Sequence, residues 1–112
     1  MVDYPAGSIA VIFVSRRTSG DDAGYAAAAD AMGTLAARQP GYLGIDSVRG
    51  ADGVGITVSY WADDASARAW HAHPDHAAVR AKGHADWYDG WHIVVGEVVR
   101  AYAGAYAGGH RV

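Results

Sequence analysis

The chain has 112 residues, no cysteine and a net charge of −3. This length fits one small domain. The lack of cysteine excludes disulfide frameworks, thiolate nucleophiles and zinc–thiolate sites. The nine cationic residues are too scattered to form a nucleic-acid-binding surface. No apolar run approaches membrane length and the N-terminus shows no signal peptide, so we expect a cytoplasmic protein that binds neither nucleic acid nor membrane.

The N-terminal half begins with a strand and a helix. β-Branched side chains over residues 8–16 predict the strand. Apolar residues at helical spacing over residues 21–38 predict the helix, which Ser19 or Asp21 can cap. Two further strands are expected over residues 42–49 and 54–61, joined by the turn-forming residues Gly50-Ala51-Asp52-Gly53.

The C-terminal half adds two helices and a last strand. One helix begins near residue 62 and runs to about residue 72. Pro74 interrupts it but suits the first turn of a second helix over residues 75–85. Residues 87–102 predict a long strand. We expect a single domain over residues 1–102, followed by a flexible Gly/Ala-rich tail over residues 103–112.

The order strand–helix–strand–strand–helix–strand predicts an α+β fold, with a ferredoxin-like antiparallel sheet covered by helices on one face. Strands in such a sheet usually alternate apolar and polar side chains. Here both faces are apolar: in the first strand, Ile9, Val11 and Phe13 oppose Ala10, Ile12 and Val14. Because the helices can cover only one face, we expect the other to pack on a second copy of the chain in a homodimer.

Tryptophan and histidine concentrate in one stretch. All four tryptophans and five of the six histidines lie within residues 60–92. Aromatic faces bury area and ring N–H groups fix orientation, so this composition suits a pocket for a flat organic ligand. After Pro74, four residues share one helical face: His76, Arg80, Gly83 and Trp87. The alternative is that Trp70 and Trp87 are core residues and that His76 is a hydrogen-bonded buried imidazole.

Three histidines, His71, His73 and His76, are spaced like metal ligands. On a continuous helix the last two share a face, whereas His71 does not, and no acidic side chain converges on them. We therefore expect no metal site. The sequence also contains no serine nucleophile elbow, no phosphate-binding glycine loop and no evident pair of catalytic carboxylates.

Several segments together resemble the antibiotic biosynthesis monooxygenase (ABM) family: Tyr60-Trp61-Ala62-Asp63-Asp64, Ala69-Trp70, His73-Pro74-Asp75-His76, Gly83, Trp87-Tyr88 and Val98-Val99-Arg100-Ala101-Tyr102. The resemblance spans about Ile9 to Tyr102. It implies a dimeric α+β barrel with a pocket in each protomer between sheet and helices. Some members oxidise anthrone-type polyketides to quinones with O₂ and no metal or prosthetic group. Others degrade haem, are isomerases or have no known activity.

Within this resemblance, Trp70 corresponds to a tryptophan that both oxygenase branches share. Quinone-forming members carry a tyrosine at the position of His76. Haem degraders place their iron-ligating histidine about one turn later, where this chain has Val79 or Arg80. Both branches use a catalytic asparagine, and this chain contains none, so neither mechanism transfers unchanged.

We therefore expect a monooxygenase that oxidises a flat aromatic or polyketide-like substrate with O₂ and without a cofactor. The expected catalytic residues are His76 as general base, Trp70 as a wall for the ring, and Arg80 as the cation that stabilises the developing anion. The expected substrate-binding residues are Tyr60, His73, Gly83, Trp87 and Trp91. One alternative is a haem-binding or haem-degrading protein with His76 or His73 as axial ligand. The other is a non-catalytic dimeric module that binds a small molecule.

Overall fold

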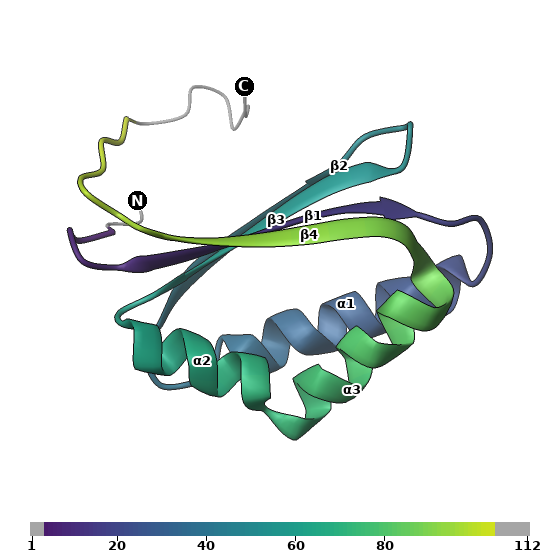
Figure 1. The fold of residues 1–112 in the computed structure, drawn as a ribbon, viewed down its shortest axis with the longest axis horizontal. Coiled ribbons are helices and arrows are strands. Elements are labelled where there is room, and N and C mark those ends of the chain that lie inside the picture. The colour runs from purple at the N-terminus through teal and green to yellow at the C-terminus, as the bar shows by residue number, and fades with distance from the viewer. Residues whose placement is uncertain (1–3, 105–112) are drawn as a thin grey trace.

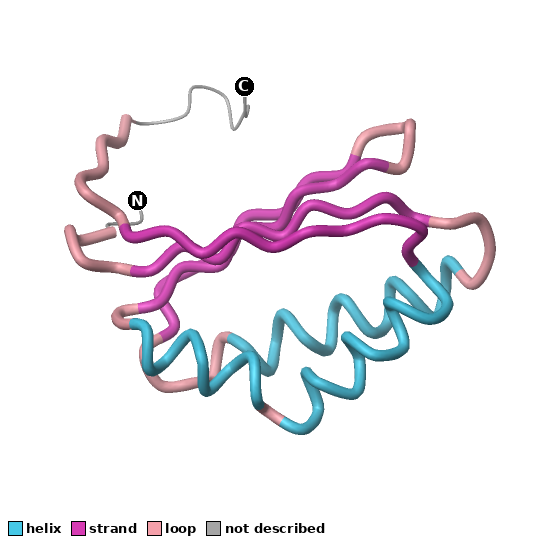
Figure 2. Tube along the Cα trace, viewed as in Figure 1, coloured by secondary structure: helices cyan, strands magenta, loops and turns pink. Residues whose placement is uncertain are grey.

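The computed structural model describes residues 4–104. The elements follow in the order β1 (Ile9–Arg17), α1 (Asp22–Ala36), β2 (Tyr42–Arg49), β3 (Val54–Trp61), α2 (Asp64–Ala72), α3 (Pro74–Lys82), the π-helical turn η1 (Gly83–Trp87) and β4 (Tyr88–Glu97). The strands form one antiparallel sheet in the order β2-β3-β1-β4. All helices lie on one face of this sheet (Figure 1, Figure 2). The predicted ferredoxin-like α+β fold is confirmed.

The last two elements differ from the prediction. α3 ends at Lys82, and η1 then leads into β4. β4 ends at Glu97 instead of reaching residue 102. Val98 still exchanges two backbone hydrogen bonds with residues 7 and 8. The apolar residues after Val98 predicted a longer strand. Because β1 begins at Ile9, which pairs with Glu97, no residue of β1 is left to pair with them. Most of the predicted tail, residues 105–112, lies outside the described residues.

One face of the sheet packs on the helices. Its side chains come from alternate positions, such as Ile9 and Val11 on β1 and Trp61 on β3. Trp61 is fully buried and stacks on Trp70 of α2, with the ring centroids 6.1 Å apart. The hydrophobic core therefore sits at one end of the sheet, and it places Trp70 directly beneath β3.

The opposite face, called the outer face below, is apolar and exposed. Ile12 in the middle of β1 pairs with Val58 and Val94, and Val94 is 54% exposed. Val48, Val54 and Ile56 on the neighbouring strands are exposed as well. Such a surface is unusual for a sheet that faces water alone. The structure thus places the predicted second apolar face opposite the helices.

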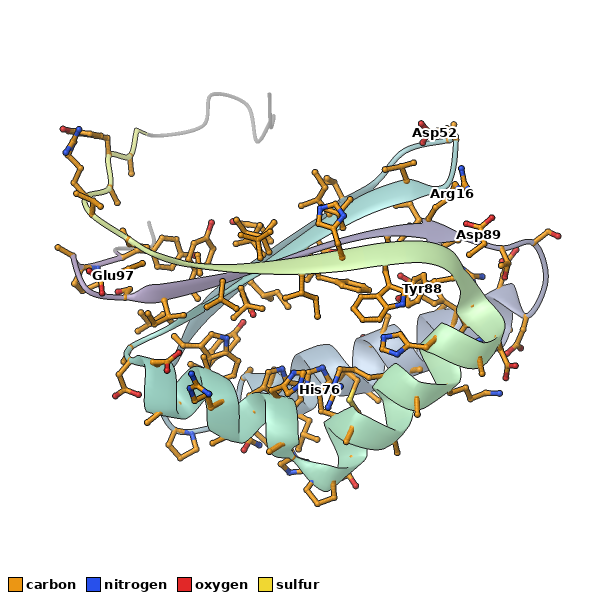
Figure 3. The ribbon with its side chains drawn as sticks, viewed as in Figure 1. Arg16, Asp52, His76, Tyr88, Asp89 and Glu97 are labelled. Carbon is orange, nitrogen blue, oxygen red and sulfur yellow. The ribbon has the colours of Figure 1, made fainter. Side chains whose placement is uncertain are left out.

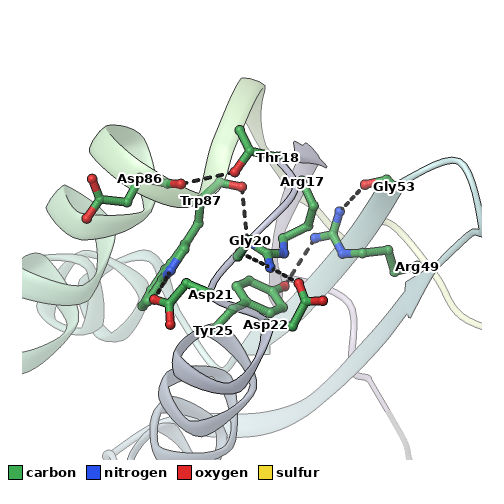
Figure 4. A network of polar contacts seen from close by, with 10 residues as sticks. All are labelled: Arg17, Thr18, Gly20, Asp21, Asp22, Tyr25, Arg49, Gly53, Asp86 and Trp87. Carbon is green, nitrogen blue, oxygen red and sulfur yellow. Dashed lines mark hydrogen bonds and ion pairs between the residues drawn. The ribbon is translucent and has the colours of Figure 1, made fainter.

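A cluster of charged and aromatic side chains joins the far end of the sheet to α1 and η1 (Figure 4). We call it the Arg17 network; it comprises Arg17, Asp21, Asp22, Tyr25, Arg49 and Trp87. The Arg17 side chain is only 8% exposed, lies over the Tyr25 ring and donates hydrogen bonds to Asp22 and to the carbonyls of Gly20 and Trp87. Its position ties the end of β1 to the start of α1 and to the end of η1.

The rest of the Arg17 network is equally well hydrogen-bonded. Arg49 donates to the hydroxyls of Ser15 and Tyr25 and to the carbonyl of Gly53. The Trp87 indole donates to the Asp21 carboxylate over 3.0 Å. This bond holds the pKa of Asp21 below its usual value. Trp87 itself is buried.

Candidate functional site

The turn between α2 and α3 determines where His76 lies. Pro74 occupies the first turn of α3, as expected, because its fixed φ and missing N–H suit that position. His73 ends α2 and caps α3, with its Nδ1 accepting the N–H of Asp75 at 3.2 Å. The chain therefore bends sharply between α2 and α3 (Figure 1), and His76 in the first turn of α3 (labelled in Figure 3) comes to lie against Trp70.

His76 stacks on Trp70. Their rings are 4.2 Å apart between centroids and 11° from parallel. The Nδ1 atom of His76 lies 2.9 Å from the backbone carbonyl oxygen of Trp70. A carbonyl oxygen can only accept a hydrogen bond, so Nδ1 carries the imidazole proton. Trp70 thus fixes the ring in position and in tautomer, and the His71 ring meets the same imidazole edge to face.

Burial lowers the pKa of His76 to about 4. The hydrogen bond to the Trp70 carbonyl opposes this shift, whereas the positive charge of Arg80 adds to it. The imidazole is therefore neutral at pH 7. Because Nδ1 holds the proton, the second ring nitrogen, Nε2, keeps a free lone pair. Such a nitrogen can accept a proton from a substrate or bind a metal ion.

Arg80 lies one turn after His76 on α3. Its Nη2 donates to the carbonyl of His71, 2.7 Å away, near the C-terminal end of α2. A cation is favourable there because the last carbonyls of a helix carry partial negative charge. The Nε of Arg80 is buried and has no hydrogen-bond partner among residues 4–104. We call Trp70, His71, His73, His76 and Arg80 together the Trp70 corner.

Besides Trp91, which is described below, three predicted site residues lie outside the Trp70 corner. Tyr60 points to the outer face, where its ring stacks on Tyr4 at 3.8 Å, so it cannot wall a pocket beside Trp70. Trp87 belongs to the Arg17 network. A β-carbon on Gly83 would approach the Tyr88 ring to 2.8 Å, so Gly83 makes room for that tyrosine. These three positions fit structural roles.

Trp91 lies on the helix-facing side of β4, opposite Ser15 of β1. It is 46% exposed, unlike the three other tryptophans, which are buried. His84 of η1 stacks on it, with centroids 4.1 Å apart and planes 2° from parallel. Sequence reasoning missed this partnership, because the π-helical turn breaks the spacing that would have put the two residues together.

One shallow hollow borders the Trp70 corner. Its volume is about 270 Å³, and it reaches an edge of Trp70 beside the loop that contains Gln39 and Pro40. A second hollow, of about 290 Å³, lies away from the corner and is lined by Trp91 and Ser15 together with outer-face residues such as Val14 and His92. His76 lines neither. Within residues 4–104 no three histidine or acidic side chains come together as metal ligands, and no helix is long and apolar enough to cross a membrane.

Comparison with known proteins identifies the family. The sequence model of the family described as antibiotic biosynthesis monooxygenase matches residues 8–82. A relative from Bacillus subtilis (strain 168), the uncharacterized protein YqjZ, is 47% identical over 91 residues, which cover 81% of this chain and 79% of YqjZ.

Solved structures share the fold. A mutant of SnoaB, a cofactor-independent oxygenase from Streptomyces nogalater, superposes with a TM-score of 0.73 at 16% identity, covering 86% of this chain and 97% of SnoaB. Protein SO0527 from Shewanella oneidensis superposes with a TM-score of 0.75 at 13% identity, covering 90% of this chain and all (100%) of SO0527. Because the family match spans most of the chain and the fold agrees, this chain belongs to the antibiotic biosynthesis monooxygenase family.

Proposed function

We propose that this chain is a cofactor-independent monooxygenase that oxidises a flat aromatic or polyketide-like substrate, with His76 as its general base. The observation that carries the proposal is the contact of His76 Nδ1 with the Trp70 carbonyl, which leaves Nε2 without a hydrogen-bond partner among residues 4–104. Burial, which lowers the pKa of His76, keeps that nitrogen unprotonated at pH 7. A base held in one orientation needs no reorganisation before it accepts a proton. The likeness to SnoaB, which is a cofactor-independent oxygenase, supports this choice of chemistry.

The reaction needs no redox group in the protein when the substrate anion itself reduces O₂. Nε2 of His76 takes one proton from a ring CH₂ group of an anthrone-like substrate. The resulting carbanion gives one electron to O₂, and the substrate radical and superoxide join at that carbon. The peroxide takes up the proton from His76, and loss of water then breaks the O–O bond. One CH₂ group and one O₂ become one C=O group and one water.

Trp70 and Arg80 have supporting roles in this proposal. Trp70 holds His76 by stacking and by its carbonyl. The unpartnered Nε of Arg80 is a donor for the oxygen on which negative charge develops, because a buried donor gains most from an anionic acceptor. His73, as the cap of α3, positions His76 through the backbone.

Oxygen consumption tests the proposal. 1,8-Dihydroxyanthrone is added to the purified protein, and we expect O₂ uptake above the uncatalysed rate. Substitution His76→Gln should lower that uptake about 100-fold or more, whereas Asp30→Asn, at an exposed position of α1, should not. Binding of the anthrone without O₂ uptake would contradict the enzyme and favour a non-catalytic binding module.

A haem-binding protein is the second candidate, and the same Nε2 atom favours it. A neutral imidazole whose other nitrogen is bound to a carbonyl is a suitable axial ligand for haem iron. Haem would supply O₂ activation, with His76 holding the iron. Titration with hemin decides between the two: a shifted Soret band that disappears in His76→Gln favours haem, and an unshifted band favours the cofactor-independent enzyme.

We also propose that the chain forms a homodimer through the outer face. The exposed apolar side chains there support this arrangement. The chain after β4 runs on the same side of the sheet (Figure 1), with Val99 and Tyr102 exposed. Val94→Asp should dissociate the dimer in light scattering, because a charge would be buried without a partner. Ala27→Asp on the exposed side of α1 is the control, and a monomeric wild-type protein at micromolar concentration would contradict the dimer.

A further inference from the structure

Trp91 and His84 form a stacked pair, and no hydrogen bond to His84 accounts for the position of its ring. The two rings are almost parallel, 2° apart in plane and 4.1 Å between centroids. His84 is exposed and makes no hydrogen bond to any residue within the described range 4–104. Stacking on Trp91 is therefore the contact that holds its ring.

The helix-facing side of β4 is open around this pair. Val95, two residues after Ile93 on the same face as Trp91, is 55% exposed although its side chain points toward the helix layer. Trp61 and Trp87 donate their indole N–H groups to Ser59 and Asp21, whereas those of Trp91 and Trp70 have no such partner in the described part of the chain. Trp91 thus offers a ring face, an apolar neighbour and a free donor.

We propose that Trp91 is the stacking platform for the ring of a flat aromatic ligand, and that the His84 ring occupies this platform until the ligand displaces it. This inference rests on the proposed function, and it assigns a specific contact to the substrate. The stack itself shows that the Trp91 face accepts a planar ring in parallel orientation. Displacing His84 from Trp91 breaks one aromatic contact and no hydrogen bond within residues 4–104.

If the His84 ring competes with the ligand for Trp91, then removing His84 and removing Trp91 should change ligand affinity in opposite directions. Removing His84 eliminates the competing ring, so His84→Ala should bind a flat ligand more tightly, by a factor of roughly two to ten. Removing the platform should weaken binding by a similar or larger factor. A pair that merely stabilises the link between η1 and β4 would give the same direction of change for both substitutions.

The test uses 1,8-dihydroxyanthraquinone, a flat product-like probe that is not turned over. Its affinity is measured by quenching of tryptophan fluorescence in the full-length wild-type protein and in His84→Ala, His84→Phe and Trp91→Leu, with folding checked by circular dichroism. We expect tighter binding for His84→Ala, near wild-type binding for His84→Phe, which restores a competing ring, and at least tenfold weaker binding for Trp91→Leu. Asp30→Asn, at an exposed position of α1, is the control.

Three results would overturn the inference. These are unchanged affinity in Trp91→Leu, weaker binding in His84→Ala, and no binding of the probe to either the wild-type protein or His84→Ala. If one of these occurs while His76→Gln still abolishes O₂ uptake, the platform is wrong and the proposed function stands. If the wild-type protein takes up no O₂ but the affinities change as expected, Trp91 is the stacking platform and the proposed oxygenase activity is wrong.

Discussion

The Arg17 network and the Trp70 corner are built from the same kinds of side chain and differ in what they leave free. Each combines a buried tryptophan with a cationic side chain that donates to backbone carbonyls. In the Arg17 network the guanidinium and indole donors reach carboxylates, hydroxyls and carbonyls. In the Trp70 corner, Nε2 of His76 keeps its lone pair, and Nε of Arg80 is the buried side-chain atom without a partner among residues 4–104.

This difference separates a structural cluster from a candidate reactive one. A satisfied network fixes elements in place and has no capacity left for a ligand. A buried donor and a lone pair without partners are unfavourable for stability and gain when a ligand supplies the missing contacts. The comparison therefore predicts that substitutions in the network change stability and that substitutions in the corner change chemistry.

The largest stability effect should come from Arg17. Replacement by methionine keeps much of the apolar stem but removes three hydrogen bonds and the contact with Tyr25, so we expect a loss of about 2–4 kcal/mol in the free energy of unfolding by urea. Arg16→Met is the control: Arg16 is exposed and pairs with exposed Asp89, so little stability should be lost. An unchanged urea midpoint of unfolding for Arg17→Met would contradict a structural role for the Arg17 network.

The pH dependence of stability should report His76. Its pKa is lower in the folded protein, about 4, than its ordinary value of 6.5. Between these values the unfolded chain binds a proton that the folded chain does not, so stability falls as the pH drops from about 6.5 to about 4. Allowing for partial solvent screening, we expect a loss of about 1–2 kcal/mol. Urea denaturation of His76→Gln should lack this component; an unchanged pH profile would contradict the assigned protonation state.

The smallest stability effect should come from Arg80. Arg80→Gln loses the favourable charge near the end of α2 but also removes the unpartnered Nε, so we expect a net change below about 1 kcal/mol. The lost positive charge should raise the pKa of His76, and O₂ uptake with the anthrone should fall. A large loss of stability with normal O₂ uptake would show that Arg80 has a structural role and not a catalytic one.

The fold and the Trp70 corner were predictable because they depend on local signals. Strand and helix periodicity gave the element order, and Pro74 located the turn that brings His76 to Trp70. Tyr60 was misplaced although the signal existed: it alternates with Trp61 along β3, and only one of the two can face the helices.

Other features depend on contacts that the sequence does not encode locally. Trp87 had the aromatic ring and polar N–H expected of a ligand contact, but Asp21, distant in sequence, takes that N–H. His84 and Trp91 meet because η1 has π-helical geometry. Predicting shared faces from the α-helical period of 3.6 residues therefore did not bring them together. The end of β4 depends on where β1 begins.

Nitrogen NMR of the histidine rings reports the protonation state and tautomer of His76. In protein labelled with ¹⁵N at histidine, we expect His76 to be neutral at pH 7, with its proton on Nδ1 and a free lone pair on Nε2, and to titrate near pH 4. A titration near the ordinary value of 6.5, or a neutral ring with its proton on Nε2, would rule out His76 as the anchored neutral base.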